Sequence, residues 1–197
     1  MEGFSQLLTG YSEFERMAQA MASGNTPVLA TGLAAVHKAH WVVSMAARLK
    51  KGGLVIAPDE ASAIKLMEDM NIMAGEEAAI LFPSRELTFQ EVEGVSREYE
   101  HARLAVLGKL AAGSSKLVVA SAAAALQYTM PPQVLSSKIR TLKTGESYDL
   151  KELTRFLLGA GYSRADQVEG VCQFFQRGGM LDFFPPQLAD PVRVEFW

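Results

Sequence analysis

The sequence predicts an α/β fold in which a parallel-sheet domain is followed by a small α+β domain with an antiparallel sheet. Through residues 1–128, short continuous apolar runs alternate with helical patterns, which is typical of a parallel sheet covered by helices. The segment "TMPP" at 129–132 breaks that rhythm, and a helix and several strand patterns separated by turn residues follow it. We therefore expect two domains, at 1–128 and 129–197.

The elements of the first domain are marked by apolar periodicity and by residues that start or stop helices. Helical patterns begin with capping or acidic residues, or end at glycine. Strand patterns are short uninterrupted apolar runs. The expected helices are 12–23, 39–51, 59–73, 96–113 and 122–128, and the expected strands are 26–31, 54–58, 78–83 and 116–121.

The second domain has a different pattern, in which strand follows strand. Gly178 and Gly179 separate two strand patterns as a tight turn would. The expected helix is 147–162, and the expected strands are 137–145, 167–176, 180–185 and 192–197. Because the sequence stops inside the last strand pattern, "VRVEFW", we expect it to be a piece of a longer protein, cut near its end.

Composition limits the class of protein. The chain has 197 residues, of which 49% are hydrophobic and 21% charged, as expected for a globular protein with ample core material. A net charge of −3 gives no basic field over the whole chain that would indicate nucleic-acid binding. Cys172 is the one cysteine, so neither an internal disulfide nor a cysteine metal cluster is possible. The sequence has no signal-peptide pattern and no long apolar run, so we expect a cytoplasmic protein without membrane contact.

The stretch "TGLAAVHKAH" has the order of a phosphate-binding loop but lacks two of its residues. Gly32 and Lys38 match the first glycine and the lysine of the pattern G-x-x-x-x-G-K-[ST]. His37 replaces the second glycine, whose small size lets successive N–H groups face the phosphates. Ala39 replaces the hydroxyl residue that holds Mg²⁺. We expect an ordinary turn between strand and helix, or a degenerate nucleotide loop.

A metal site is not expected in the same stretch. His37 and His40 are three residues apart, so a helix could place both on one face. However, no third ligand lies nearby in the sequence, and zinc sites use at least three protein ligands. We expect solvated or partly packed imidazoles.

The second half contains the segments "GYSRADQVEGVCQFFQRGGMLDFFP" and "PVRVEFW". Together these segments resemble the module shared by the nucleotide excision repair protein UvrB and the bacterial transcription-repair coupling factor, Mfd. The residues that fit the family pattern are Tyr162, Arg164, Asp166, Gln167, Arg177, Gly178, Asp182, Phe184, Pro185, Arg193, Glu195 and Phe196. The segments 53–70, 99–110 and 116–126 are similar to the helicase-like domain that precedes this module in UvrB.

Two departures favour the N-terminal UvrB-like module of the coupling factor over UvrB itself. His37 and Ala39 break the nucleotide loop that looks intact in UvrB. The segment 84–95 is too short for the tyrosine-rich hairpin that UvrB uses to clamp DNA, and it contains no tyrosine. The resemblance then implies a degenerate P-loop domain followed by a small domain that docks on the damage sensor UvrA.

The resemblance implies a non-catalytic recruitment module without a cofactor. The module would bring UvrA to a stalled RNA polymerase. The contacts with polymerase and DNA, and a translocase motor that uses ATP and Mg²⁺, would belong to other parts of the parent protein. A further reading is that another domain of the parent covers the UvrA surface until polymerase is engaged. The alternative from a different class is the nucleotide-binding half of a UvrB-like ATPase or helicase that engages DNA.

Four residues are the candidates for partner binding. Arg164 and Arg177 match arginines of the UvrA-facing surface of UvrB, and the guanidinium fork suits paired contact with carboxylates. Phe175 lies two residues before Arg177, so it shares a strand face with it, where UvrB looks to have another arginine. Of Phe183 and Phe184, we expect one in the core and Phe184 among the candidates beside the arginines.

A basic alternation in the second domain allows two interpretations. Lys138, Arg140 and Lys143 lie in the expected strand 137–145. They could contact DNA phosphates. Equally, they could protect an edge strand from pairing with another chain.

Overall fold

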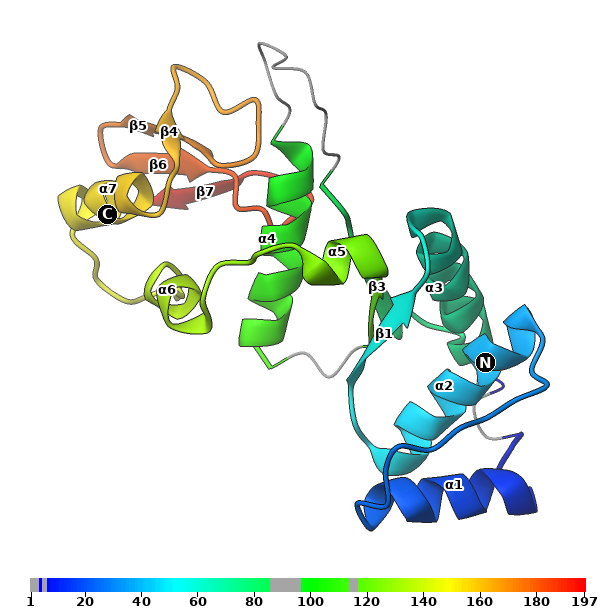
Figure 1. Ribbon diagram of the computed structural model, residues 1–197. Helices are drawn as coiled ribbons and strands as arrows, with labels where there is room; N and C mark the ends of the chain where they lie inside the picture. Colours follow the sequence, from blue (N-terminus) through cyan, green and yellow to red (C-terminus); the bar gives the residue numbers. More distant parts are fainter. Residues whose placement is uncertain (1–3, 5–6, 86–96, 114–116) are drawn as a thin grey trace, which may run out of the picture. The chain divides into compact units, whose positions relative to one another are not determined.

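The computed structural model describes residues 4, 7–85, 97–113 and 117–197, and the chain divides into two compact units (Figure 1). The first unit comprises Met1–Glu91 and Ser114–Gln127, and the second comprises Val92–Gly113 and Tyr128–Trp197. The division after Gln127 adjoins the expected boundary at residue 128. Helix α4 (Glu98–Ala111), which we expected in the first domain, groups with the second unit.

The sheet of the first unit is parallel. Its strands are β1 (Gly53–Ala57), β2 (Ala79–Phe82) and β3 (Leu117–Ser121), in the order β1-β3-β2. Every residue of β3 is buried, which explains its continuous apolar sequence at the centre of the sheet. The parallel pairing confirms the α/β class expected for this part of the chain.

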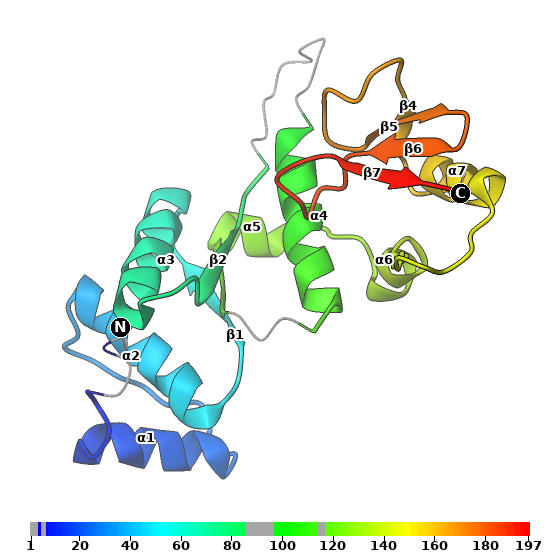
Figure 2. The same cartoon turned by 180° about the vertical axis from the view of Figure 1, so that it is seen from behind.

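Helices α2 (Ala35–Leu49) and α3 (Glu60–Ala74) lie on the same side of this sheet, as Figures 1 and 2 show. Asp59 caps α3 by accepting a hydrogen bond from the Ser62 amide at 2.7 Å, and Gly75 ends it in the left-handed conformation. The core between the helices and the sheet consists of Ala39, Val43, Ala57, Ala63, Met70, Ala79, Leu117 and Val119.

The remaining helices of the first unit are α1 (Ser12–Ala22) and the short α5 (Ala122–Leu126). Phe14 and Ala18 of α1 pack on Met45 of α2. The expected strand at 26–31 is wrong: this segment forms neither helix nor strand, and Leu29 within it is 86% exposed. An apolar run becomes a strand only where a neighbouring strand accepts its hydrogen bonds, and 26–31 pairs with none of the described strands.

The second unit contains a mixed sheet with the strand order β4-β5-β6-β7. The strands are β4 (Ser163–Arg164), β5 (Gln173–Arg177), β6 (Met180–Phe183) and β7 (Val192–Glu195). Pairing from β5 to β7 is antiparallel, as expected, but β4 pairs with β5 in parallel. The two-residue strand β4 was not among the expected strands, and it precedes β5 through the loop 165–172 rather than through a hairpin.

Helix α7 (Leu150–Gly159) covers one face of this sheet. Leu153 and Leu157 pack on Phe174 and Leu181 from the strands. Asp149 caps the helix by accepting hydrogen bonds from the amides of Lys151 and Glu152.

The expected strand at 137–145 is wrong. Helix α6 (Pro132–Ser137) occupies its start, and the residues after it are irregular. Proline at the first position of α6 costs no hydrogen bond, because that amide has no partner in a helix anyway.

Among the described residues, no helix combines the length and apolar character needed to cross a bilayer.

Two backbone features fix the hairpin of β5 and β6. Gly178 has a φ of 56°, the left-handed value that a two-residue hairpin turn needs at its first central position. Cys172 has a φ of 62°. Its amide donates to Phe184 O, and the Phe184 amide donates back to Gln173 O, so two residues of one strand lie opposite Phe184. This is a β-bulge with cysteine at the position that glycine usually occupies.

Candidate partner-binding surface

The residues of the nucleotide-loop motif are mostly helical. Helix α2 begins at Ala35, so His37, Lys38 and Ala39 have helical conformation, and the Lys38 amide donates to Ala34 O at 3.0 Å. An amide used inside a helix is not available to a phosphate. Ala39 is fully buried in the core between α2 and the sheet. Gly32, with a φ of 77°, forms the turn before the helix.

His37 and His40 are not part of a group of side chains that could bind a metal ion, among the residues that the structure describes. Nε2 of His40 lies 2.7 Å from Phe4 O, and His37 is exposed. In the described ranges, no group of three His, Cys, Asp or Glu side chains is placed to hold a metal ion.

The strand register of the second unit sorts its side chains onto two faces. Phe174 pairs with Phe183, and Gln176 pairs with Leu181, and these side chains face α7. The alternate residues therefore face the other way. We call this second side the open face, and its residues are Phe175, Arg177, Met180, Asp182, Arg193 and Glu195.

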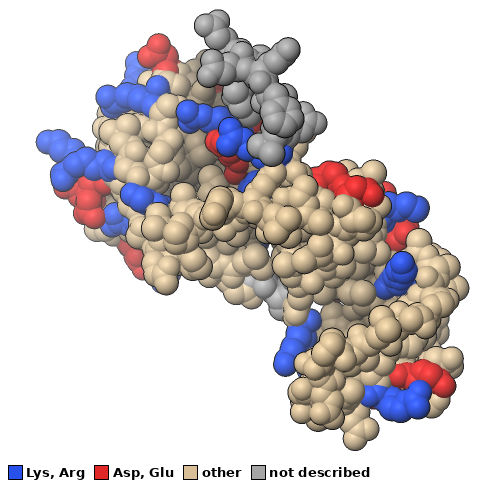
Figure 3. All heavy atoms as spheres, in the orientation of Figure 1, with Lys and Arg blue, Asp and Glu red and all other residues tan. Residues whose placement is uncertain are grey.

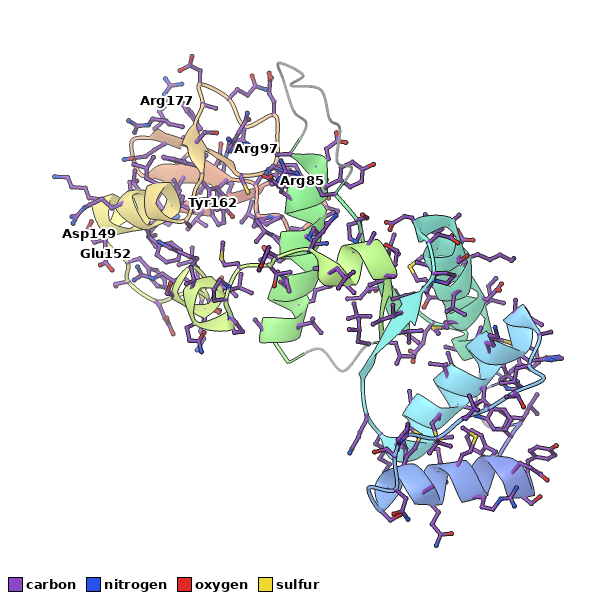
Figure 4. All side chains as sticks on the ribbon, in the orientation of Figure 1. Arg85, Arg97, Asp149, Glu152, Tyr162 and Arg177 are labelled. Atoms are coloured by element: carbon purple, nitrogen blue, oxygen red, sulfur yellow. The ribbon has the colours of Figure 1, made fainter. Side chains whose placement is uncertain are left out.

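The open face is accessible and carries charge of both signs. Arg177, Met180, Arg193 and Glu195 are exposed, and Phe175 is half-buried. Figure 4 shows Arg177 on the side of the sheet away from α7, at whose N-terminus Asp149 and Glu152 are labelled. In Figure 3, Lys and Arg side chains on the visible side of this unit are interspersed with Asp and Glu.

Asp182 and Arg193 form a two-bond ion pair across β6 and β7 on the open face. Arg193 Nε donates to Asp182 Oδ1 at 2.7 Å, and Arg193 Nη2 donates to Asp182 Oδ2 at 2.8 Å. These hydrogen bonds lower the pKa of Asp182 below its ordinary value. Both carboxylate oxygens of Asp182 are therefore occupied.

Arg177 is different, because it is a cation without an internal partner. Within the part of the chain that the structure describes, its guanidinium makes no ion pair or hydrogen bond. Phe175 lies beside it along β5, opposite Asp182 on β6. An exposed arginine next to a half-buried aromatic ring is a combination enriched at protein interfaces.

Phe184 continues the alternation of β6 and lies on the side of the open face. Its amide donates to Gln173 O, and its carbonyl accepts from the Cys172 amide. Phe183 packs in the core with Phe174, as expected for one residue of the pair. Phe184 is half-buried.

Arg164 lies on the other face. It is in register with Phe174, and its guanidinium carbon is 6.0 Å from the centre of that ring. Its Nη2 is 3.5 Å from Gln176 Oε1, which also accepts from Thr154 Oγ1 of α7. The structure therefore does not bring the two candidate arginines to one face.

The basic residues of the expected strand 137–145 have internal partners. Lys138 donates to Gly159 O at the end of α7, and Arg140 pairs with Glu152 at 2.9 Å. Lys143 is 3.8 Å from Glu146. Protection of an edge strand is thus a wrong explanation, because no strand forms there. Cations at the C-terminal end of a helix and beside a carboxylate stabilise the local structure instead.

In the sequence, Asp182 and Arg193 stand out only as matches to a family pattern, and their pairing was not predicted. A signal was present in "PVRVEFW". Val192 and Val194 alternate with Arg193 and Glu195 along this strand. Arg193 and Glu195 therefore share the face away from the core. The partner strand and the register, which put Asp182 opposite Arg193, could not be derived from that alternation.

Most of the second unit is similar in sequence to a known class of interaction domain. Residues 141–197 match the sequence model of the UvrB interaction domain. In segment 84–95, where we expected a short replacement for the UvrB hairpin, residues 86–95 lie outside the described part of the chain.

Whole-chain comparisons point to the bacterial transcription-repair coupling factors. The chain is 25% identical over 197 residues to the factor of Bacillus subtilis strain 168. The aligned region covers 100% of this chain and 17% of that relative. It is also 25% identical over 186 residues to the factor of Staphylococcus aureus strain USA300, covering 94% of this chain and 16% of that one. The chain thus spans about a sixth of the length of these relatives. The resemblance and the UvrB-like fold class expected from the sequence are confirmed.

Proposed function

We propose that this chain is a non-catalytic module that recruits the repair protein UvrA, and that its parent is a transcription-repair coupling factor. The observation that carries the proposal is Arg177: an exposed arginine, unpaired in the described chain, beside Phe175 on the open face of a UvrB interaction domain. The parent would supply the contacts with RNA polymerase and DNA, and a translocase motor that uses ATP and Mg²⁺.

The partner surface centres on Arg177 and Phe175, with Phe184 on the same side. Arg177 would pair with a carboxylate of UvrA, and Phe175 would bury apolar area beside it. Arg164 would contribute from the edge strand β4, where it is exposed. Its contacts with Phe174 and Gln176 give it a second, structural role, so its share of the binding energy is smaller.

We further propose that residues 32–39 are a degenerate nucleotide loop that binds no ATP. The helical conformation of His37 and Lys38 and the burial of Ala39 support this. They weigh against the alternative of an ATPase or helicase half-site, which needs a loop of amides around the phosphates and a hydroxyl on Mg²⁺.

Calorimetric titrations of the chain with UvrA and, separately, with Mg-ATP test both statements. We expect binding to UvrA with a Kd in the micromolar range or tighter, and no heat with ATP. Binding of ATP without binding of UvrA would overturn the proposal and favour the enzyme class. A parent protein that covers its own UvrA surface would bind UvrA more weakly than this chain, and equal affinities would exclude such covering.

A further inference from the structure

On the open face, Asp182 could form an ion pair with either of two arginines. Asp182 has two arginines within side-chain reach. Arg193 lies directly opposite it on β7, and Arg177 lies diagonally across on β5, because Asp182 is in register with Phe175, two residues before Arg177. Diagonal positions on neighbouring antiparallel strands are about 7–8 Å apart, a distance that an arginine side chain spans.

In the structure, Asp182 forms its ion pair with Arg193. Its two hydrogen bonds, at 2.7 and 2.8 Å, use both carboxylate oxygens. The Asp182 side chain is 19% exposed and that of Arg193 is 60% exposed. Arg177 is left without a partner among the described residues. Glu195, the other acid of this face, lies opposite Met180, with β6 between it and Arg177.

We propose that Arg193 is a positioning residue for partner binding: by occupying Asp182, it keeps Arg177 unpaired and available to a carboxylate of the partner. The inference rests on the proposed function, because it concerns how the same surface recognises an acidic partner. Arg193 need not touch that partner. Without Arg193, Asp182 pairs with Arg177, and the partner must then compete with an internal carboxylate.

Binding of UvrA by four variants separates this role from a merely structural one. Arg193→Ala should weaken binding roughly two- to fivefold. The reason is that the partner must then displace an exposed ion pair between Asp182 and Arg177, and such a pair contributes up to about 1 kcal/mol. Asp182→Asn, and Asp182→Asn combined with Arg193→Ala, should bind like the wild type, because neither leaves an internal competitor for Arg177. Arg155→Ala, which removes an exposed cation from α7, is the matched control.

A structural role predicts a different pattern. If the ion pair only supports the sheet, Asp182→Asn and Arg193→Ala break it equally and must weaken binding equally. That result would overturn the inference. Circular dichroism of each variant verifies that it is folded.

A titration that needs no partner decides the same point. The pKa of the Asp182 carboxyl, followed by NMR, is expected to stay below its ordinary value in Arg193→Ala, because Arg177 takes over. The pKa of Asp182 should rise to its ordinary value only when Arg177→Ala is added. A full rise in Arg193→Ala alone would overturn the inference. If the wild type binds no UvrA, the proposed function fails, while the titration still decides whether Arg193 keeps Arg177 unpaired.

Discussion

Arg164 and Arg177 lie on opposite faces of one sheet. Arg164 is in register with Phe174 and lies over that ring, on the face that α7 covers. Arg177 alternates with Gln176 and so lies on the open face. Two arginines that look equivalent in the sequence therefore have different surroundings, and their replacement should have different consequences.

Replacing Arg164 should cost folding stability, whereas replacing Arg177 should not. Arg164→Ala removes the contact with the Phe174 ring and a long hydrogen bond to Gln176, which together stabilise the fold by about 0.5–1 kcal/mol at an exposed position. Arg177→Ala removes no hydrogen bond, ion pair or ring contact within the described chain. Urea denaturation measures both. Equal loss of stability in the two variants would contradict the assignment of faces.

Gly179 should tolerate no side chain. A Cβ built on it would lie 2.9 Å from the backbone oxygen of Phe196, which cannot move without shifting β7. We expect Gly179→Ala to destabilise the fold by about 1–3 kcal/mol in thermal or urea unfolding. The neighbouring Gly178 has open space around its Cβ position and a φ of 56°. Gly178→Asn, which suits that conformation, is the control, and it should cost clearly less.

Asp149 should make stability depend on acid pH. Hydrogen bonds from the amides of Glu152 and Lys151 lower its pKa below the unfolded value. A carboxyl with a lowered folded pKa stabilises the fold above its unfolded pKa, about 3.9, and this contribution is lost as pH falls through the folded pKa. Asp149→Asn keeps an oxygen acceptor at the N-cap but does not titrate.

The measurement is the free energy of unfolding of both proteins between pH 6 and pH 3. We expect the Asp149→Asn variant to lose less stability than the wild type over that range. Parallel losses would show that the carboxylate at the start of α7 does not contribute in this way.

The contrast between β3 and segment 26–31 shows what the sequence can predict about the fold. The run "LVVAS" is a strand because β1 and β2 pair with it on both sides. The run "PVLA" is similarly apolar, yet it forms no strand, because pairing depends on distant residues that a local pattern does not contain. Helices α3 and α7 were predictable because their caps, Asp59 and Asp149, act within a few residues.

The candidate surface was predictable to a similar extent. Alternation along β5 places Phe175 and Arg177 on one face without any knowledge of the fold. The face of Arg164 follows only from the parallel register of the two-residue strand β4 with β5, which is a long-range relation. The same holds for the pairing of Asp182 with Arg193, and for the burial of Ala39 against the sheet.

Restoring the hydroxyl of the nucleotide-loop motif should damage the protein rather than repair it. Ala39 is 0% exposed and packs in the core of the first unit. Ala39→Thr adds volume and a polar hydroxyl to this packed core, at an expected cost of about 1–3 kcal/mol in unfolding free energy. Lys38→Ala, at the exposed neighbouring position, should change stability by less than about 0.5 kcal/mol. An Ala39→Thr variant as stable as the wild type would contradict the close packing around Ala39, and one that binds ATP would contradict the proposal of a degenerate loop.

The most direct test of the central claim is the affinity of UvrA for Arg177→Ala compared with Arg155→Ala, measured by calorimetry. Both variants remove one exposed arginine from the second unit, but only Arg177 lies on the open face. We expect Arg177→Ala to lose about 2–4 kcal/mol of binding free energy, as a central interface arginine does, and Arg155→Ala to bind like the wild type. Equal affinities of the two variants would contradict the claim that UvrA is recruited through the open face.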